Sequence, residues 1–100
     1  MANSSTPEQI MLAMLKTDLG ISSATAYDAR FTQLLAVAQR EITAEGVSTL
    51  DASDPRDQQI IVMYAAWLWR GRDNMPMMPR MLRLALNNRK FGETAGDSDG

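Results

Sequence analysis

The strongest hydrophobic pattern in the chain covers residues 60–69, a run of ten residues without a charge, a glycine or a proline. Asp54 and Pro55 precede this run, and the pair is typical of a helix start, because aspartate caps free N–H groups and proline needs no hydrogen bond there. Gly71 follows the run. The pattern predicts a helix from Asp54 to about Arg70. Apolar side chains nearly encircle its second half, so we expect neighbours on several sides, and in so small a chain these can include another protein.

A short amphipathic helix is predicted near the N-terminus. Thr6 is followed three residues later by Gln9, which is a capping-box pattern, and Pro7 suits the first helical position. Gly20 is predicted to end this helix in a left-handed conformation, with Ile21 packing back onto it. The helix is too short to be stable alone and needs tertiary contacts.

A long amphipathic helix is predicted next, from capping candidates at Ser22 to Thr25 to about Glu45, where Gly46 ends it. Its apolar positions lie on one side, as in a surface helix that packs on a core, and are Tyr27, Phe31, Leu34, Leu35, Ala38 and Ile42. Val47 and Leu50 are expected to hold the following connection to the core.

The chain changes character after Gly71. Two prolines three residues apart, Pro76 and Pro79, interrupt any helix there. A last helix is predicted from Pro79 to about Lys90, with its end at Phe91-Gly92. Beyond it the sequence holds three acidic residues and almost nothing apolar, so residues 92–100 are expected to be disordered.

The predicted fold is all-α, since the sequence shows no internal repeat and no alternating strand pattern of useful length. We expect a small helical domain of about four helices, with a long amphipathic second helix and an apolar central third helix. The expected organisation is a disordered N-terminus at 1–5, a single helical domain at 6–91 and a disordered acidic tail at 92–100. One hundred residues suffice for one such domain.

The charge distribution is uneven although the net charge is only −2. Residues 1–69 hold four basic and eight acidic side chains, residues 70–90 hold six basic and one acidic, and residues 91–100 hold three acidic. The basic stretch has two interpretations. It contacts nucleic-acid phosphates, or it meets the acidic face of the long helix in a neighbouring copy; we favour the second, because no aromatic interleaving or DNA-reading motif accompanies it.

Enzymatic chemistry is not expected. The chain contains no His and no Cys, which removes the commonest general bases, the thiol nucleophiles and most transition-metal ligands. Glu41 and Glu45 lie one helical turn apart, but such a pair is more typical of a charged helix surface than of catalysis. We predict no cofactor and no metal. No apolar run is long enough to span a membrane and no secretory signal is recognisable, so no membrane association is expected.

Interaction candidates cluster between positions 67 and 83. Trp67 and Trp69 point about 200° apart around their helix, so one is expected in the core and the other either under the proline-rich turn or on a partner. The methionines around the two prolines form either a lid on the core or an adaptable docking strip. The predicted partner or oligomer interface comprises Trp67, Trp69, Arg70, Arg72, Met75, Met77, Met78, Arg80 and Arg83.

The order of these signals resembles the small head-tail connector proteins of tailed bacteriophages. The resemblance covers about residues 8 to 72. It is carried by residues 11–16 with Leu19-Gly20-Ile21, by the apolar positions of the long helix from Tyr27 through Ile42 to Gly46, and by Asp54-Pro55 with the run at 60–69. The C-terminal third lies outside the pattern.

The resemblance implies a helical virion protein that forms a ring of roughly a dozen copies, binds the portal protein on one side and a tail-side connector on the other, and surrounds the DNA path, with possible non-specific contact to DNA. It implies synthesis in the host cytoplasm, residence in the virion at the head-tail interface, and no catalysis. The alternative reading of the residues is a small helical nucleic-acid-binding or regulatory protein that uses its basic C-terminal helix.

Overall fold

The computed structural model describes residues 6–21, 25–74 and 78–99, which form four helices and no strand. These are α1 (Pro7–Leu19), α2 (Asp28–Glu45), α3 (Pro55–Asn74) and α4 (Arg80–Asp99). The side chains of residues 72–74 and 93–99 are not described. The predicted all-α class, with a long second helix and a central third helix, is confirmed.

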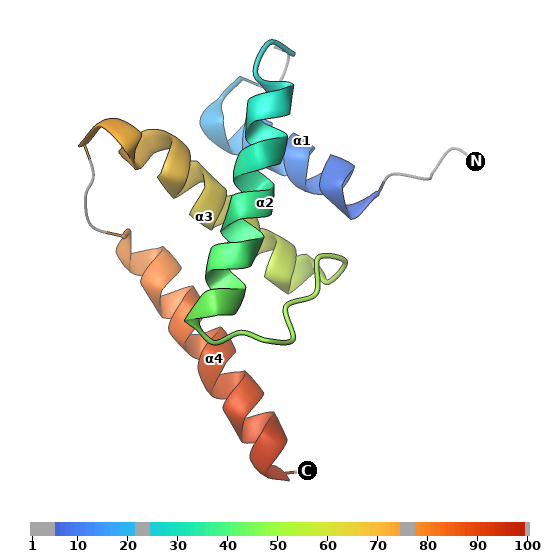
Figure 1. Ribbon diagram of the computed structural model, residues 1–100, viewed down its shortest axis with the longest axis vertical. Coiled ribbons are helices and arrows are strands. Elements are labelled where there is room, and N and C mark those ends of the chain that lie inside the picture. Colours follow the sequence, from blue (N-terminus) through green and yellow to red (C-terminus); the bar gives the residue numbers. More distant parts are fainter. Residues whose placement is uncertain (1–5, 22–24, 75–77, 100) are drawn as a thin grey trace.

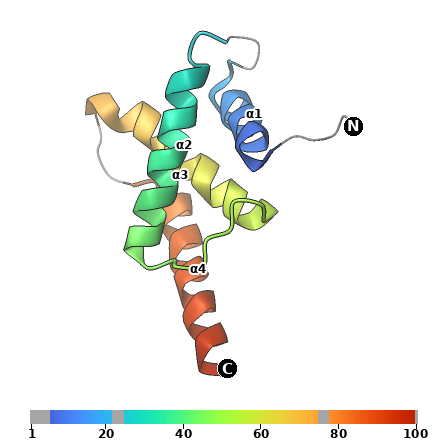
Figure 2. The same ribbon diagram turned by 45° about the vertical axis from the view of Figure 1, so that its right-hand side comes forward.

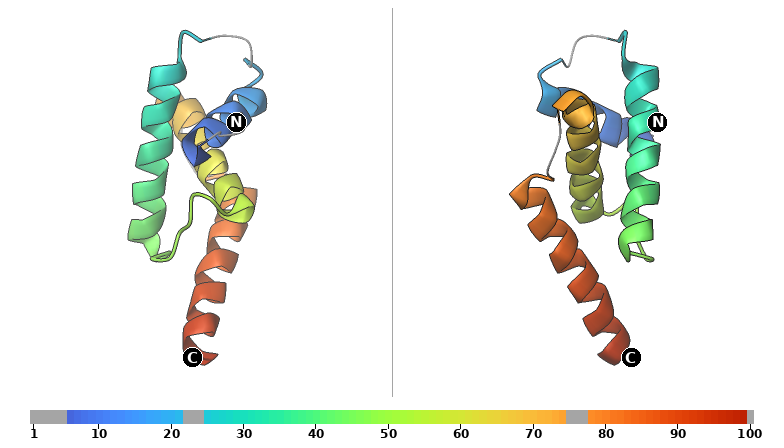
Figure 3. Two further views of the ribbon diagram at one scale, coloured as in Figure 1. Left: turned by 90° about the vertical axis from the view of Figure 1, so that its right-hand side faces the viewer. Right: turned by 60° about the vertical axis from the view of Figure 1, so that its left-hand side comes forward.

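Helix α3 is the element on which the other three pack (Figure 1). Its neighbours α1 and α2 also contact each other. Helix α4 packs mainly on α3, and its C-terminal half extends past the ends of the other helices in every view (Figures 2 and 3). The expectation that the apolar third helix needs neighbours on several sides is therefore met within the chain.

The core is built from the predicted apolar stripes, except that Tyr27 of the predicted second-helix stripe precedes α2 and is 47% exposed. Helix α2 contributes Phe31 and Ile42 from its stripe, both almost fully buried. Val47 is also fully buried and Leu50 partly so, as expected for a connection held to the core. The other buried apolar side chains are Met11 and Leu15 of α1, Leu34, Leu35 and Ala38 of α2, Ile60, Ile61, Val62, Tyr64, Ala65 and Ala66 of α3, and Leu82 and Leu86 of α4.

The predicted ends of α1 are confirmed. The Thr6 hydroxyl accepts a hydrogen bond from the Gln9 N–H at 3.1 Å, and the Gln9 side chain accepts one from the Thr6 N–H at 3.0 Å. At the other end Gly20 adopts a left-handed conformation with φ of 77°, and the Ile21 N–H donates to the Lys16 carbonyl at 2.9 Å.

The start of α2 differs from the prediction. The helix begins at Asp28, after Tyr27, whose side chain accepts no capping hydrogen bond. Of the predicted capping residues, Thr25 receives the Asp28 N–H through its backbone carbonyl at 3.2 Å, whereas positions 22–24 lie outside the described residues. A side-chain oxygen is a good helix cap only when the backbone places it beside a free N–H, which sequence spacing alone does not fix.

Helix α3 begins as predicted and ends later. The Asp54 carboxylate accepts a hydrogen bond from the Arg56 N–H at 2.9 Å, and Pro55 occupies the first helical position. The helix then continues through Gly71 to Asn74. A glycine costs about 1 kcal/mol relative to alanine inside a helix, but it keeps its N–H, so it does not by itself end one.

Helix α4 also continues past a glycine. The sequence predicted its end at Phe91-Gly92, whereas the helix reaches Asp99. A Cβ added at Gly92 would meet no atom within 4 Å, so the helix passes through open space there. Disorder of residues 92–100 in solution stays a prediction that amide hydrogen exchange would test.

Replacing Gly46 with alanine is expected to lower the free energy of unfolding by about 1–3 kcal/mol, because φ at Gly46 is 127° and side chains rarely adopt that value. The added Cβ would also lie 3.2 Å from Cδ of Lys90. The matched control is Gly92→Ala, which is expected to raise the same free energy by about 0.5–1 kcal/mol. Urea unfolding followed by far-ultraviolet circular dichroism measures both, and equal effects would contradict the prediction.

Candidate functional site

Catalytic machinery is not visible in the described part of the chain. No group of three or more acidic side chains lies close enough there to hold a metal ion. Burial raises the pKa of the Tyr64 hydroxyl, Glu45 and Glu41 act in the same direction, and Arg83 opposes them. This hydroxyl therefore stays protonated near neutral pH and is a poor general base.

The remaining candidate is a surface, and α4 provides it. The inner face of α4 packs on the core through Leu82 and Leu86, which are almost fully buried. Ala85, Arg89 and Lys90 are partly buried on the same side. These five positions follow the i, i+3, i+4, i+7, i+8 spacing of one helix face, so the opposite side of α4 points away from the domain.

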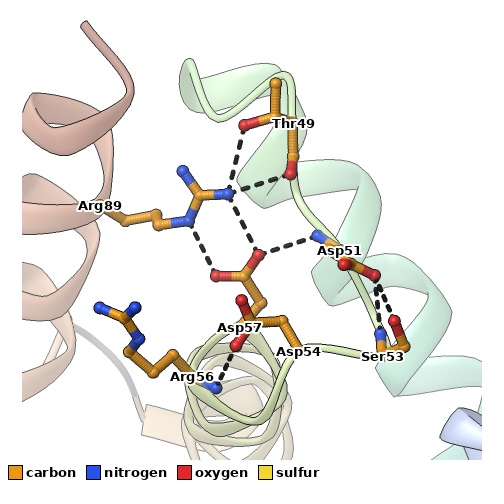
Figure 4. A network of polar contacts seen from close by, with 7 residues as sticks. All are labelled: Thr49, Asp51, Ser53, Asp54, Arg56, Asp57 and Arg89. Atoms are coloured by element: carbon orange, nitrogen blue, oxygen red, sulfur yellow. Dashed lines mark hydrogen bonds and ion pairs between the residues drawn. The ribbon is translucent and has the colours of Figure 1, made fainter. Parts of the chain in front are cut away.

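A buried ion pair holds this orientation (Figure 4). The Asp57 carboxylate, with only 2% of its side chain exposed, receives Nε of Arg89 at 2.8 Å and a second guanidinium nitrogen at 3.1 Å. The same nitrogen donates to the carbonyl of Thr49 at 3.0 Å, and the Asp51 N–H donates to Asp57 at 2.8 Å. One arginine thus joins α4 to the start of α3 and to the loop after α2.

The outer face of α4 exposes three large apolar side chains. Met81 is 71% exposed, Leu84 50% and Phe91 76%. They follow the spacing i, i+3, i+10, and Asn88 occupies the intervening i+7 position on the same face, where it is exposed. We call Met81, Leu84, Asn88 and Phe91 the outer stripe. Isolated exposed apolar residues are normal, whereas three on one helix face form a candidate interaction surface.

The basic residues of this region divide into two groups. Lys90 lies 3.8 Å from Glu45, and Arg89 binds Asp57, so part of the basic stretch meets acidic groups of its own chain. Arg80 and Arg83 are exposed on α4. Lys90 thus meets an acidic residue of α2 within its own subunit. Contact of the basic stretch with the long helix of a neighbouring copy stays a prediction.

Both tryptophans are half-buried against the core. The Trp69 ring lies edge-on to Phe31, with centroids 4.9 Å apart, and 5.5 Å from Tyr27. The Trp67 ring is 5.4 Å from Tyr64, and its buried Nε1 has no hydrogen-bond partner among the described residues. Trp69 therefore contributes to the packing of α3 on α2. An interface role for either tryptophan stays a prediction.

The other predicted interface residues lie in different places. Arg70 is exposed at the end of α3 and donates to the carbonyl of Asp18 at 3.4 Å. Met78 is partly buried against the core. Met75 and Met77 lie outside the described residues, as does the side chain of Arg72. Of the predicted set, the structure thus brings only Arg80 and Arg83 onto the helix that carries the outer stripe.

The sequence reasoning missed two features. The outer stripe is visible in the sequence as an apolar spacing, but the sequence does not tell this side of the last helix from the side that packs on the core, and Phe91 was placed at the helix end. The Asp57–Arg89 pair joins residues 32 positions apart, and no local signal connects them. Both features depend on how α4 is rotated about its axis.

Within the described residues no helix is long and apolar enough to cross a membrane. Comparison with protein-family models, with curated proteins and with solved structures gives no match to this chain.

Proposed function

We propose that this protein is a structural virion subunit, a head-tail connector that forms a ring between the portal protein and a tail-side protein around the DNA path. The observation that carries the proposal is the outer stripe of α4, with Arg80 and Arg83 beside it. A subunit that works inside an assembly needs such a surface, because apolar area left in water by the free chain becomes buried against a partner.

The order of the helices supports the same assignment. A short α1, a long α2 and a central α3 with an apolar, tyrosine-containing run follow one another as the resemblance to connector proteins implies. The core of the described domain is formed by side chains from all four of its helices. This leaves the outer stripe and the exposed arginines for contacts with other proteins of the particle.

In this proposal the ring forms through a heterologous contact between copies, in which two different patches of the subunit meet. The outer stripe of α4 contacts the portal or the tail-side protein. Arg70, Arg80 and Arg83 contact acidic groups of these partners or phosphates of the DNA passing through the ring. In this proposal the protein makes or breaks no covalent bond. It acts through the shape and charge of its contact surfaces and through the number of copies in the ring.

Sedimentation velocity over a wide concentration range, with negative-stain imaging of any large species, tests the proposal. We expect closed rings of many copies, because a heterologous contact closes when its rotation divides the circle. The opposing result is a subunit that forms no ring and instead binds short duplex DNA at about 150 mM salt with a steep salt dependence. That result would favour a nucleic-acid-binding protein.

A further inference from the structure

We propose that the outer stripe of α4 binds an acidic amphipathic helix of a partner protein. The partner helix lies along α4, covers the exposed apolar side chains with its own apolar face, and brings acidic side chains to arginines on both edges of the stripe. The inference rests on the proposed function in one respect, which is that this surface serves a partner protein of an assembly.

The outer stripe has the spacing of a helix contact. Met81, Leu84, Asn88 and Phe91 follow the a, d, a, d order of a heptad, whose a and d positions face a partner helix. The inner face of α4 already packs on the core of its own domain. The C-terminal half of α4 extends beyond the other helices (Figure 3), so a second helix can lie along the outer face without meeting them.

One edge of the stripe is basic. Arg80 and Arg83 are exposed there, and neither has an ion-pair partner within the described residues. Arg89 and Lys90, in contrast, meet acidic groups of their own chain. Residues 80–92, whose side chains are the described part of α4, include no acidic residue. This basic edge therefore attracts acidic side chains of a partner and repels basic ones.

The other edge of the stripe borders a cavity of about 350 Å³ between α4 and the start of α3. Asn88 belongs to the stripe and also lines this cavity. Arg56 lines it from α3, and Figure 4 shows the Arg56 side chain extending toward α4. The other charged residues of the lining are Asp57 and Arg89, which pair with each other, and Asp54, which caps α3. Of these four residues only Arg56 is exposed, so this edge also presents a positive charge.

The apolar stripe and its two edges together indicate the chemistry of the occupant. An amphipathic helix binds such a surface through apolar residues at heptad spacing, and glutamates at its e and g positions then lie beside the arginines on both edges. Duplex DNA offers phosphates to the arginines but little apolar area to Met81, Leu84 and Phe91. A lipid surface covers apolar side chains, but it is flat and would leave the cavity beside Asn88 unfilled.

Binding of a designed peptide to the full chain tests the proposal. The probe has about three heptads, with leucine at a and d, glutamate at e and g, and alanine or glutamine elsewhere. The control peptide has lysine in place of each glutamate. Fluorescence anisotropy of the labelled peptides is expected to give a dissociation constant at least about tenfold lower for the glutamate peptide, with an affinity that falls as salt rises.

Substitutions in the protein test where the peptide binds. Leu84→Gln, which removes apolar contact, and Arg83→Glu, which reverses a charge on the basic edge, are each expected to raise the dissociation constant of the glutamate peptide by about tenfold or more. Arg56→Glu, at the cavity edge, is expected to raise it by about threefold or more. The matched control is Arg30→Glu, which makes the same charge change at the exposed start of α2, away from α4 (Figure 1), and is expected to leave the affinity unchanged. Circular dichroism checks that each variant is folded.

The proposal is overturned by equal affinity for the two peptides, or by binding of the glutamate peptide that Leu84→Gln and Arg83→Glu leave unchanged. Tighter binding of short duplex DNA, or of vesicles that contain phosphatidylserine, through the same residues would also overturn it. Peptide binding that depends on these residues, in a chain that never forms rings, would support the acidic-helix site and weaken the connector assignment. Rings formed by a chain without affinity for the glutamate peptide would support the connector assignment and overturn this site.

Discussion

Asp57→Asn is expected to lower the free energy of unfolding by about 3–5 kcal/mol, because it leaves the Arg89 guanidinium without its counter-charge in a partly buried site. The carboxylate is 2% exposed and accepts both guanidinium bonds as well as the Asp51 N–H. An asparagine side chain keeps the shape but offers one acceptor oxygen and an N–H₂ group that faces donors. The change therefore affects three contacts between α4, α3 and the loop.

The loss is expected to release α4 first. Apart from this ion pair, α4 is held on the core mainly by Leu82 and Leu86, and by Lys90 near Glu45. A domain of this size has about 5–15 kcal/mol of stability, so the substitution removes a large part of it. Urea unfolding followed by circular dichroism measures the loss, and amide hydrogen exchange locates it in α4 if the helix detaches.

Asp54→Asn is the matched control. It makes the same chemical change three positions earlier, at the cap of α3, where the carboxylate accepts the Arg56 N–H. Asparagine caps a helix about as well as aspartate, so the control is expected to change the free energy of unfolding by less than about 0.5 kcal/mol. Equal losses in the two variants would mean that Asp57 acts only through local backbone contacts.

The parts of the fold that were predictable from sequence are those decided by near neighbours. The capping box of Thr6 and Gln9, the left-handed Gly20 and the cap at Asp54 each need only residues a few positions apart. The stripe of α2 from Phe31 to Ile42 follows from helical periodicity in the same way.

The features that could not be predicted depend on how each helix is rotated about its axis and on which distant segments it contacts. Trp67 and Trp69 are both half-buried, because α3 has neighbours on several sides. The sequence does not show which neighbouring helix lies on which side of α3. Arg89 was counted in a basic surface stretch, but a carboxylate 32 residues away takes its charge. The outer stripe became recognisable only when the inner face of α4 was known.

Phe31→Ala is the second large expected effect, a loss of about 3–5 kcal/mol in the free energy of unfolding. Phe31 is 1% exposed, and its ring packs edge-on against Trp69 at a centroid distance of 4.9 Å and beside Tyr27 at 5.9 Å. Truncation removes the apolar area and leaves a cavity between α2 and α3 that these rings cannot fill without moving. Thr32→Ala, at the next and exposed position of α2, is the control and is expected to change little.

The fluorescence of the two tryptophans reports where the damage lies. If Trp69 belongs to the α2–α3 packing, Phe31→Ala shifts the emission to longer wavelength below the urea transition, because the indole gains contact with water. The shift should appear without any change in sedimentation. The opposite result would be a Phe31→Ala protein with unchanged emission and stability, together with a Trp69→Ala protein whose assembly is altered. That result would support the predicted role of Trp69 in a partner interface. We expect the first result, because the Trp69 ring packs against the rings of Phe31 and Tyr27.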